Sequence, residues 1–223
     1  MTRAGPQRST LSRIVLGSDP IRRAIYIVGM VPAVWYFYAG INDRLGADPL
    51  NVLERALGLW ALRFLVAGLA ITPLRRLGGP NLIRYRRAVG LLAFYYAALH
   101  LTTYLVLDQG LQWAAIWADI VKRPYITVGM LAFIVLVPLA VTSNNPSIRR
   151  LGSRWNSLHR LVYLAAAAGA LHFIMLVKVW PLEPLIYLGL VAALLLFRFQ
   201  AYARKRWGPQ PAARDRSRTR RAS

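Results

Sequence analysis

Six long apolar runs constrain this chain more than any other feature of its sequence. Each run covers about 18 to 22 residues, and a helix needs about 20 apolar residues to cross a hydrocarbon core about 30 Å thick. The runs fall at 22–40, 54–74, 88–107, 125–142, 157–177 and 184–202. They predict an all-α integral membrane protein, folded as a bundle of six transmembrane helices.

The basic residues predict how this bundle is oriented in the membrane. The chain has 29 Lys and Arg residues against 8 Asp and Glu. Most of the basic residues lie near both ends of the chain and in alternate loops, whereas the other loops hold few. By the positive-inside rule, the basic segments and both termini are cytoplasmic. This segregation argues against nucleic-acid binding and makes anionic membrane lipid the expected partner of the basic segments.

The runs leave no residues for a separate soluble domain. We expect a basic cytoplasmic arm over 1–21, a transmembrane domain over 22–203 and a basic, disordered cytoplasmic tail over 204–223. Between the third and fourth runs, Trp113 and Trp117 are four residues apart. This spacing predicts a short amphipathic helix that lies on the outer interface of the membrane.

Two of the three histidines are predicted to lie at one depth in the membrane. His100 lies in the third run and His172 in the fifth, and both runs cross from the cytoplasmic side. At about 1.5 Å per residue, each histidine lies about 18 to 20 Å from the cytoplasmic face. Two imidazoles at one level on two helices suit the iron of a six-coordinate haem. The alternative is a pair of polar core residues that hydrogen-bond across helices.

The absence of cysteine restricts the kind of cofactor. A chain without cysteine has no disulfide, no iron–sulfur cluster and no covalently attached haem, so any haem is b-type and held by His or Met. The small residues 165–170 would let a flat macrocycle approach, and Gly169 lies three residues before His172; the same residues suit close helix packing. Arg63, at a similar depth, would either pair with a haem propionate or extend to the outer surface.

The third histidine, His159, is predicted to belong to a different site. It lies near the cytoplasmic face, about 19 Å from His172 along the helix, and on an ideal helix the two point about 140° apart. Arginines surround it, and they would hold a phosphate or carboxylate there: Arg149, Arg150, Arg154 and Arg160. The alternative is a topogenic basic loop with a histidine at the interface.

Several segments of the sequence together resemble the MsrQ (YedZ) family, within the ferric-reductase-like transmembrane superfamily. They are GADP at 46–49, LWAL at 59–62, ITPLR at 71–75, RRAVGL at 86–91, YAALHLT at 96–102 and LGSRWNSLHRLVY at 151–163. The resemblance covers about residues 20 to 200 in order. All three family histidines match, at His100, His159 and His172. Where superfamily members carry two histidines on the third span, this chain has only His100.

The resemblance implies a haem-binding subunit of the periplasmic methionine sulfoxide reductase system, in the bacterial inner membrane. It implies that electrons come from the quinol pool or a cytoplasmic flavin reductase and pass through haem b, with FMN as a further carrier. The gap of about 19 Å between the histidine pair and the cytoplasmic face also needs a carrier, which would be a bound flavin or quinone, or a second haem with His159 as one ligand. The acceptor is a periplasmic molybdopterin-containing, MsrP-like subunit that repairs oxidised proteins. On this hypothesis the chain is an electron conduit and its partner is the catalyst. The alternatives are a non-redox scaffold or small transporter with a histidine packing network, or another ferric-reductase-like haem protein.

Overall fold

The chain forms a bundle of long helices. The computed structural model describes residues 20–176 and 181–207, and in these ranges it has helices and no strand. Most of the predicted arm and tail lies outside the described residues. Six helical segments are long and apolar enough to cross a membrane: Pro20–Ile41, Pro49–Arg76, Ile83–Asp108, Pro124–Val141, Ser153–Leu176 and Leu182–Gln200. The predicted six-helix membrane fold is therefore confirmed.

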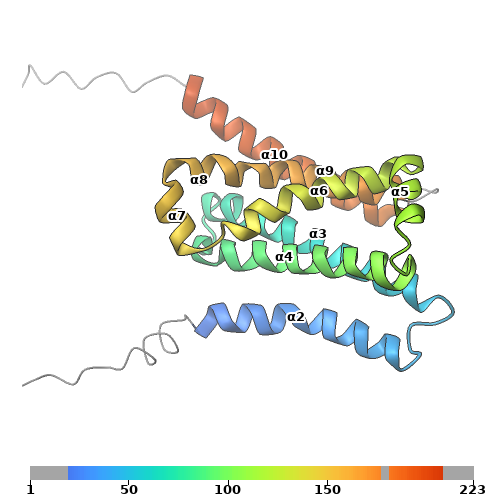
Figure 1. Ribbon diagram of the computed structural model, residues 1–223. Coiled ribbons are helices and arrows are strands. Elements are labelled where there is room, and N and C mark those ends of the chain that lie inside the picture. Colours follow the sequence, from blue (N-terminus) through green and yellow to red (C-terminus); the bar gives the residue numbers. More distant parts are fainter. Residues whose placement is uncertain (1–19, 177–180, 208–223) are drawn as a thin grey trace, which may run out of the picture.

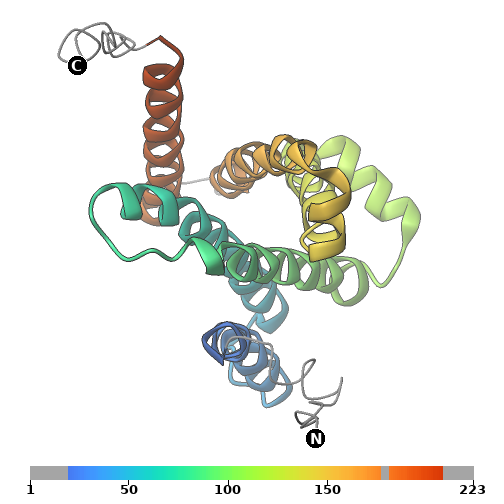
Figure 2. The same cartoon turned by 90° about the vertical axis from the view of Figure 1, so that its left-hand side faces the viewer.

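Four helices form the centre of the bundle and two lie at its edges (Figures 1 and 2). The central helices are α3 (Pro49–Arg76), α4 (Arg86–Thr102), α6 (Pro124–Val141) and α9 (Val162–Leu176). The edge helices are α2 (Pro20–Ile41) and α10 (Leu182–Trp207). Short α5 (Trp113–Lys122) lies at one end of the bundle, and α7 (Asn145–Leu151) and α8 (Ser153–Leu158) lie at the other. We call these the α5 end and the α7 end.

The outer surface of the bundle is apolar, as a lipid environment requires. Large apolar side chains on α2, α6 and α10 are more than half exposed, among them Ile27, Val34, Ile134 and Leu196. In water such a surface would be a strong aggregation liability, whereas lipid tails solvate it without cost. The chain is therefore a multi-pass membrane protein.

Charge is divided unevenly between the two ends. Within the described ranges, every acidic residue lies at or near the α5 end: Asp43, Asp48, Glu54, Asp108, Asp119 and Glu183. Arginine-rich segments fill the α7 end, which comprises the start of α2, the α3–α4 connection and α7–α8. This asymmetry is the one that the positive-inside rule associates with a cytoplasmic α7 end.

The hydroxyl of Tyr96 joins the edge helix α2 to α4. This buried side chain donates to the carbonyl oxygen of Gly29 at 2.7 Å and accepts from the backbone nitrogen of Ala33 at 2.9 Å. The hydroxyl lies between the Gly29 carbonyl and the Ala33 nitrogen, which would bond to each other in a regular helix. Pro32, next to Ala33, has no N–H to donate. Gly29 lets α2 and α4 approach closely here, because a Cβ at this position would displace the side chain of Leu92 on α4.

Three helical segments differ in detail from the predicted runs. The second run begins earlier than predicted, at Pro49, because Asp48 caps it by accepting from the Asn51 nitrogen, and it continues past Pro73 to Arg76. The third run ends in η2 (Thr103–Asp108), a stretch of π-helix directly after α4. The fifth run starts as α8 and passes through a 3₁₀ turn, η3 (His159–Leu161), into α9; another 3₁₀ turn, η1 (Ile83–Tyr85), precedes α4.

Helix α5 matches the predicted amphipathic segment. Trp113 and Trp117 are 67% and 69% exposed, whereas Ile116 on the same helix is buried. An exposed pair of tryptophans on a short helix at the end of a membrane bundle is typical of the interfacial zone of a bilayer. The exposed tryptophans are therefore consistent with the predicted place of this helix at the outer interface of the membrane.

Candidate functional site

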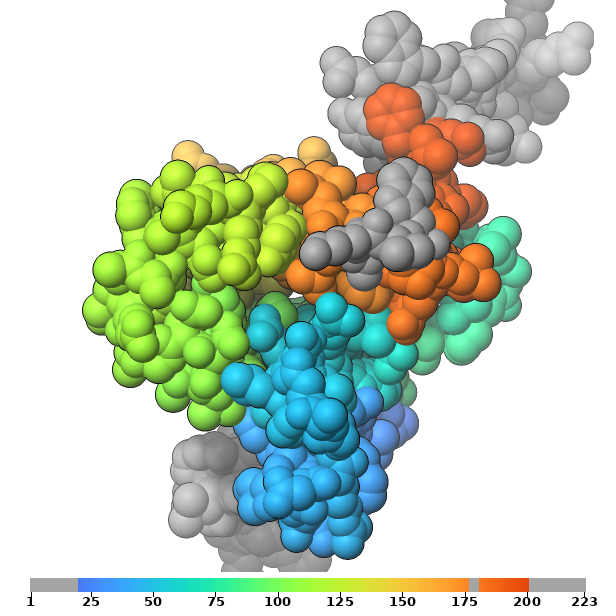
Figure 3. Space-filling model, turned by 90° about the vertical axis from the view of Figure 1, so that its right-hand side faces the viewer, coloured from blue at the N-terminus to red at the C-terminus, as the bar shows by residue number. Residues whose placement is uncertain are grey.

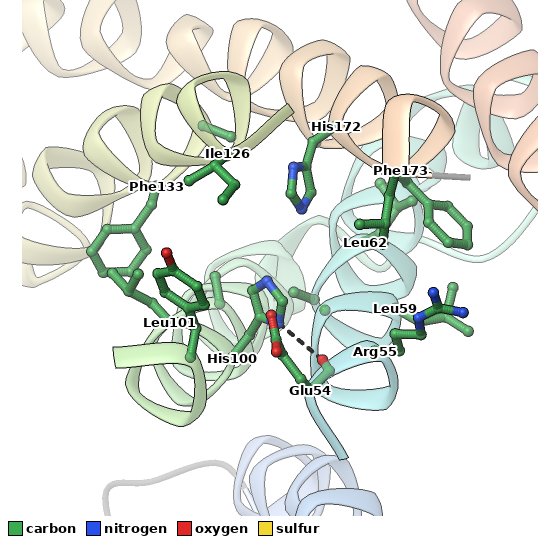
Figure 4. Close-up of a pocket in the computed structure, with 18 of the residues that line it drawn as sticks. Glu54, Arg55, Leu59, Leu62, His100, Leu101, Ile126, Phe133, His172 and Phe173 are labelled. Atoms are coloured by element: carbon green, nitrogen blue, oxygen red, sulfur yellow. Dashed lines mark hydrogen bonds between the residues drawn. The ribbon is translucent and has the colours of Figure 1, made fainter. Parts of the chain in front are cut away.

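A cavity of about 390 Å³ lies between α3, α4, α6 and α9. Figure 3 looks onto the α5 end, where the surface is hollowed between these elements. His100 on α4 and His172 on α9 face each other across the cavity (Figure 4). Their ring centroids are 6.2 Å apart and their planes differ by 67°. The structure thus brings together the two histidines that the sequence predicted to lie at one depth.

Backbone carbonyls fix the orientation of both rings. Nδ1 of His100 donates to the carbonyl oxygen of Glu54 at 2.9 Å, and Nδ1 of His172 donates to that of Tyr125 at 2.7 Å. Because a carbonyl oxygen only accepts, the hydrogen of each neutral ring is on Nδ1 and the lone pair is on Nε2. A histidine that ligates a metal is usually held by such a bond from its other ring nitrogen. Both rings are therefore arranged as ligands.

Two glycines make these ring positions accessible. Gly58 and Gly129 lie four residues after Glu54 and Tyr125, one turn along α3 and α6. A Cβ at Gly58 would be 3.2 Å from His100 Nδ1, and a Cβ at Gly129 would be 2.8 Å from His172 Nδ1. A helical side chain covers the turn before its own Cα, so any larger residue would cover the carbonyl that the ring needs. The sequence analysis missed these glycines, although each stands out within an apolar helix.

The lining of the cavity changes from apolar to polar toward the α5 end. Gly169 and Ala165 contribute to the apolar part, and a Cβ at Gly169 would come no closer than 3.9 Å to Leu62. Further apolar lining comes from Leu59, Leu65, Leu101, Met130, Phe133, Leu136 and Phe173. The polar lining includes Asp48, Asn51, Glu54, Arg55, Tyr104, Asp108 and Arg123. The cavity thus suits a flat apolar body with a charged edge.

This arrangement fits a macrocycle-bound metal better than a bare ion. A metal held by protein alone has three or four side-chain ligands, and the described residues contain no cluster of three His, Asp or Glu able to hold one. Two imidazoles suffice when a macrocycle supplies the other ligands, as in haem. Two metal–nitrogen bonds of about 2 Å, with about 1.1 Å from each nitrogen to its ring centre, give about 6.2 Å between centroids. The observed separation of 6.2 Å matches this value.

Arg63 does not line this cavity. Its Nε donates to the hydroxyl of Tyr187 at 2.9 Å, and its Nη2 lies 3.6 Å from the Glu183 carboxylate. The guanidinium also lies over the ring of Trp60, 4.8 Å from the centroid. Tyr187 and Glu183 belong to α10. The sequence of α3 alone could not show that Arg63 would pair with side chains on α10.

His159 lies apart from the pair, at the α7 end. Its ring stacks on Trp155 with centroids 3.8 Å apart, and its Nε2 lies 3.1 Å from Oγ1 of Thr142. The Thr142 hydroxyl donates to the carbonyl of Pro138 at 2.6 Å, so its oxygen accepts from His159. The hydrogen of this ring is therefore on Nε2, opposite to the arrangement at His100 and His172.

The helix is distorted between His159 and His172. The 3₁₀ turn η3 turns the chain by about 120° per residue instead of about 100°, so the ideal-helix angle does not apply. Both histidines contact α6, His172 at Tyr125 near its start and His159 at Thr142 just after its end. Arg154 and Arg160 are exposed near His159 and do not line the cavity.

Comparison with known proteins identifies the family. Residues 54–170 match the family described as ferric reductase like transmembrane component. The protein-methionine-sulfoxide reductase heme-binding subunit MsrQ of Brucella anthropi is 61% identical over 193 residues, which are 86% of each chain. The same subunits of Brucella ovis and Brucella melitensis biotype 2 are 60% identical over the same share.

The chain belongs to the MsrQ family. The matched ferric-reductase segment begins at Glu54, whose carbonyl holds His100, and includes His159. His172 lies just beyond it, within the helix that the segment enters. The sequence similarity to the MsrQ relatives extends beyond this segment, over most of the chain.

Proposed function

We propose that this MsrQ-family chain is the haem b-binding, electron-transfer subunit of a methionine sulfoxide reductase system in the bacterial inner membrane. The observation that carries the proposal is the pair of opposed imidazoles, 6.2 Å apart, with both Nδ1 atoms bonded to backbone carbonyls. The name of the relatives, a heme-binding subunit, supports the same cofactor.

In this proposal, His100 and His172 hold the haem iron through their Nε2 atoms. The haem supplies one-electron redox chemistry when bound. The carbonyls of Glu54 and Tyr125 keep both rings in the required tautomer and increase their basicity as ligands. The small residues Ala165 and Gly169 leave room beside the rings, and the apolar lining excludes water.

The charge distribution supports a direction for the electrons. The arginine-rich α7 end faces the cytoplasm, and the cavity opens toward the periplasm at the α5 end. Electrons therefore enter at the α7 end, from the quinol pool or a cytoplasmic flavin reductase. They leave at the α5 end for a periplasmic molybdopterin-containing, MsrP-like catalytic subunit, which reduces methionine sulfoxide in oxidised proteins. The chain conducts electrons and its partner performs the substrate chemistry.

A second carrier is expected at the α7 end. The rise of the helix between His159 and His172 leaves about 19 Å between the haem pair and the cytoplasmic end. Since the chain has only three histidines, His159 has no second imidazole with which to form another bis-histidine site. We propose that FMN or a quinone is held near His159, and that Arg154 and Arg160 attract its anionic form or that of the donor.

The absorbance spectrum of the purified protein tests the proposed cofactor. We expect an intense Soret band and a sharp α-band on reduction, as a low-spin b-type haem gives. Reoxidation of the reduced protein by a periplasmic methionine sulfoxide reductase then tests the proposed acceptor. A folded, monodisperse and colourless protein would contradict the redox function and favour a packing network of histidines.

A further inference from the structure

The polar end of the cavity has two arginines from separate parts of the chain. Arg55 lies near the start of α3, and Arg123 immediately precedes α6. Figure 4 shows Arg55 beside Leu59 on α3, with its guanidinium directed away from His100 in this view. Together with His100 on α4 and His172 on α9, they place one functional group on each of the four segments around the cavity.

The two arginines have capacity for a further anion. In the described part of the chain, Arg55 makes no side-chain hydrogen bond or salt bridge. Arg123 contacts Asp119 through Nε at 3.2 Å and donates from Nη1 to the Tyr125 hydroxyl at 3.3 Å, which leaves Nη2 available. The contacts with Tyr125 and Asp119 raise the pKa of the Arg123 guanidinium, so it stays a cation.

The same end of the cavity has acidic side chains, which a negatively charged ligand would have to avoid. Asp48, Glu54 and Asp108 all line it. Like charges at short range destabilise each other, so a ligand with carboxylates needs a cation for each of them here. Arginine is suited to this because its planar guanidinium binds a carboxylate through two parallel hydrogen bonds.

We propose that Arg55 and Arg123 bind the two propionate carboxylates of the haem, and that Arg63 does not. The inference rests on the proposed haem-binding function and assigns residues that the sequence analysis missed. Arg63 has the same charge and lies on the same helix as Arg55, but Glu183 and Tyr187 on α10 already occupy its guanidinium. It is therefore a matched control for Arg55.

Two measurable properties follow from this assignment. Hydrogen bonds to charged groups contribute about 1.5–3 kcal/mol, so loss of either arginine should speed haem dissociation about tenfold or more. A cation near the haem also stabilises the reduced form, which carries one positive charge fewer at the iron. Removing that cation should lower the midpoint potential, while the low-spin spectrum stays unchanged because the iron ligands are intact.

The experiment compares the haem-loaded full chain with R55Q, R123Q and R63Q in nanodiscs. Haem transfer to apomyoglobin gives the dissociation rate, and a redox titration gives the potential. We expect faster haem loss and a lower potential for R55Q and R123Q, and parental values for R63Q. Parental values for both R55Q and R123Q, or a change in R63Q alone, would overturn the assignment.

Haem dimethyl ester, which has no propionate charge, separates ligand contacts from general instability. Because the ester lacks both propionate charges, we expect the parent to lose the ester at least as fast as R55Q and R123Q lose haem, with no further acceleration of ester loss in those variants. If R55Q and R123Q also accelerate loss of the ester, the arginines act on the fold and the assignment is wrong. A parent chain that binds no haem at all would instead contradict the proposed function.

Discussion

The two ends of the helical stretch 153–176 hold histidines in opposite ways. At the α5 end, His172 has Nδ1 bonded to a backbone carbonyl, Nε2 free, and a second imidazole 6.2 Å away across a cavity. At the α7 end, His159 has Nε2 bonded to Thr142 and its ring stacked on Trp155. On the proposed function, the nitrogen left free and the space in front of it distinguish the ligand His172 from the packed His159.

Among substitutions that keep both His100 and His172, the largest effect is expected from crowding the ring at the α5 end. Gly129→Ala places a Cβ 2.8 Å from His172 Nδ1, which breaks the bond to the Tyr125 carbonyl or moves the ring. Overpacking costs about 1–3 kcal/mol, so haem affinity should fall about tenfold, as measured by haem titration of the apoprotein. Gly90→Ala is the control, because nothing lies within 4 Å of its Cβ position. Equal affinities for both variants would remove the proposed role of Gly129.

A smaller loss is expected from filling the cavity away from the rings. Gly169→Leu puts an isobutyl group into space that we assign to the macrocycle, whereas Gly169→Ala adds only a methyl group 3.9 Å from Leu62. Haem content at purification should fall several-fold for the leucine variant and little for the alanine variant, with membrane insertion intact. Full occupancy in Gly169→Leu would assign the small residues at 165–170 to helix packing alone.

Changing the histidine at the α7 end should leave haem content unchanged. His159→Ala keeps the ligands of the haem, so its spectrum should match that of the parent. Reduction of the haem by a quinol or by reduced flavin should become slower, whereas direct reduction by dithionite should stay fast. Stopped-flow absorbance measures all three rates. Parental rates with every donor would leave His159 as an interfacial residue that anchors the start of α9.

The smallest effect is expected from the partner of His159. Thr142→Val keeps the shape of the side chain but removes the oxygen that accepts from the ring, and a neutral hydrogen bond contributes about 1 kcal/mol. Reduction by quinol or flavin should slow less than in His159→Ala. If haem reduction is slower in Thr142→Val than in His159→Ala, Thr142 acts independently of His159. The hydrogen bond between the two residues then does not explain the effect.

The sequence predicted the features that depend on distance along a helix. The rise per residue is nearly constant, so counting from the basic ends of two runs placed His100 and His172 at one level, and the structure brings their rings together. The apolar runs likewise predicted the six helices long enough to span a membrane, and the four-residue spacing of Trp113 and Trp117 predicted the short helix α5.

Features that depend on how helices rotate and pack were not predictable from one sequence. Arg63 contacts Glu183 and Tyr187 on α10, because the orientation of a long side chain depends on partners from a helix distant in sequence. The need for glycine at 58 and 129 appears only once α4 and α9 bring their histidines against those turns. The 3₁₀ turn at His159 changes the angle about the helix axis between His159 and His172.

The low-spin ferric haem signal of His100→Ala and His172→Ala tests the central claim most directly. Electron paramagnetic resonance of the purified variants, with His159→Ala as the matched control, measures it. Because one iron needs both imidazoles, each of the first two variants should lose the same low-spin signal, and the control should keep it. If either His100→Ala or His172→Ala keeps the signal unchanged, the two rings across the cavity do not hold one haem.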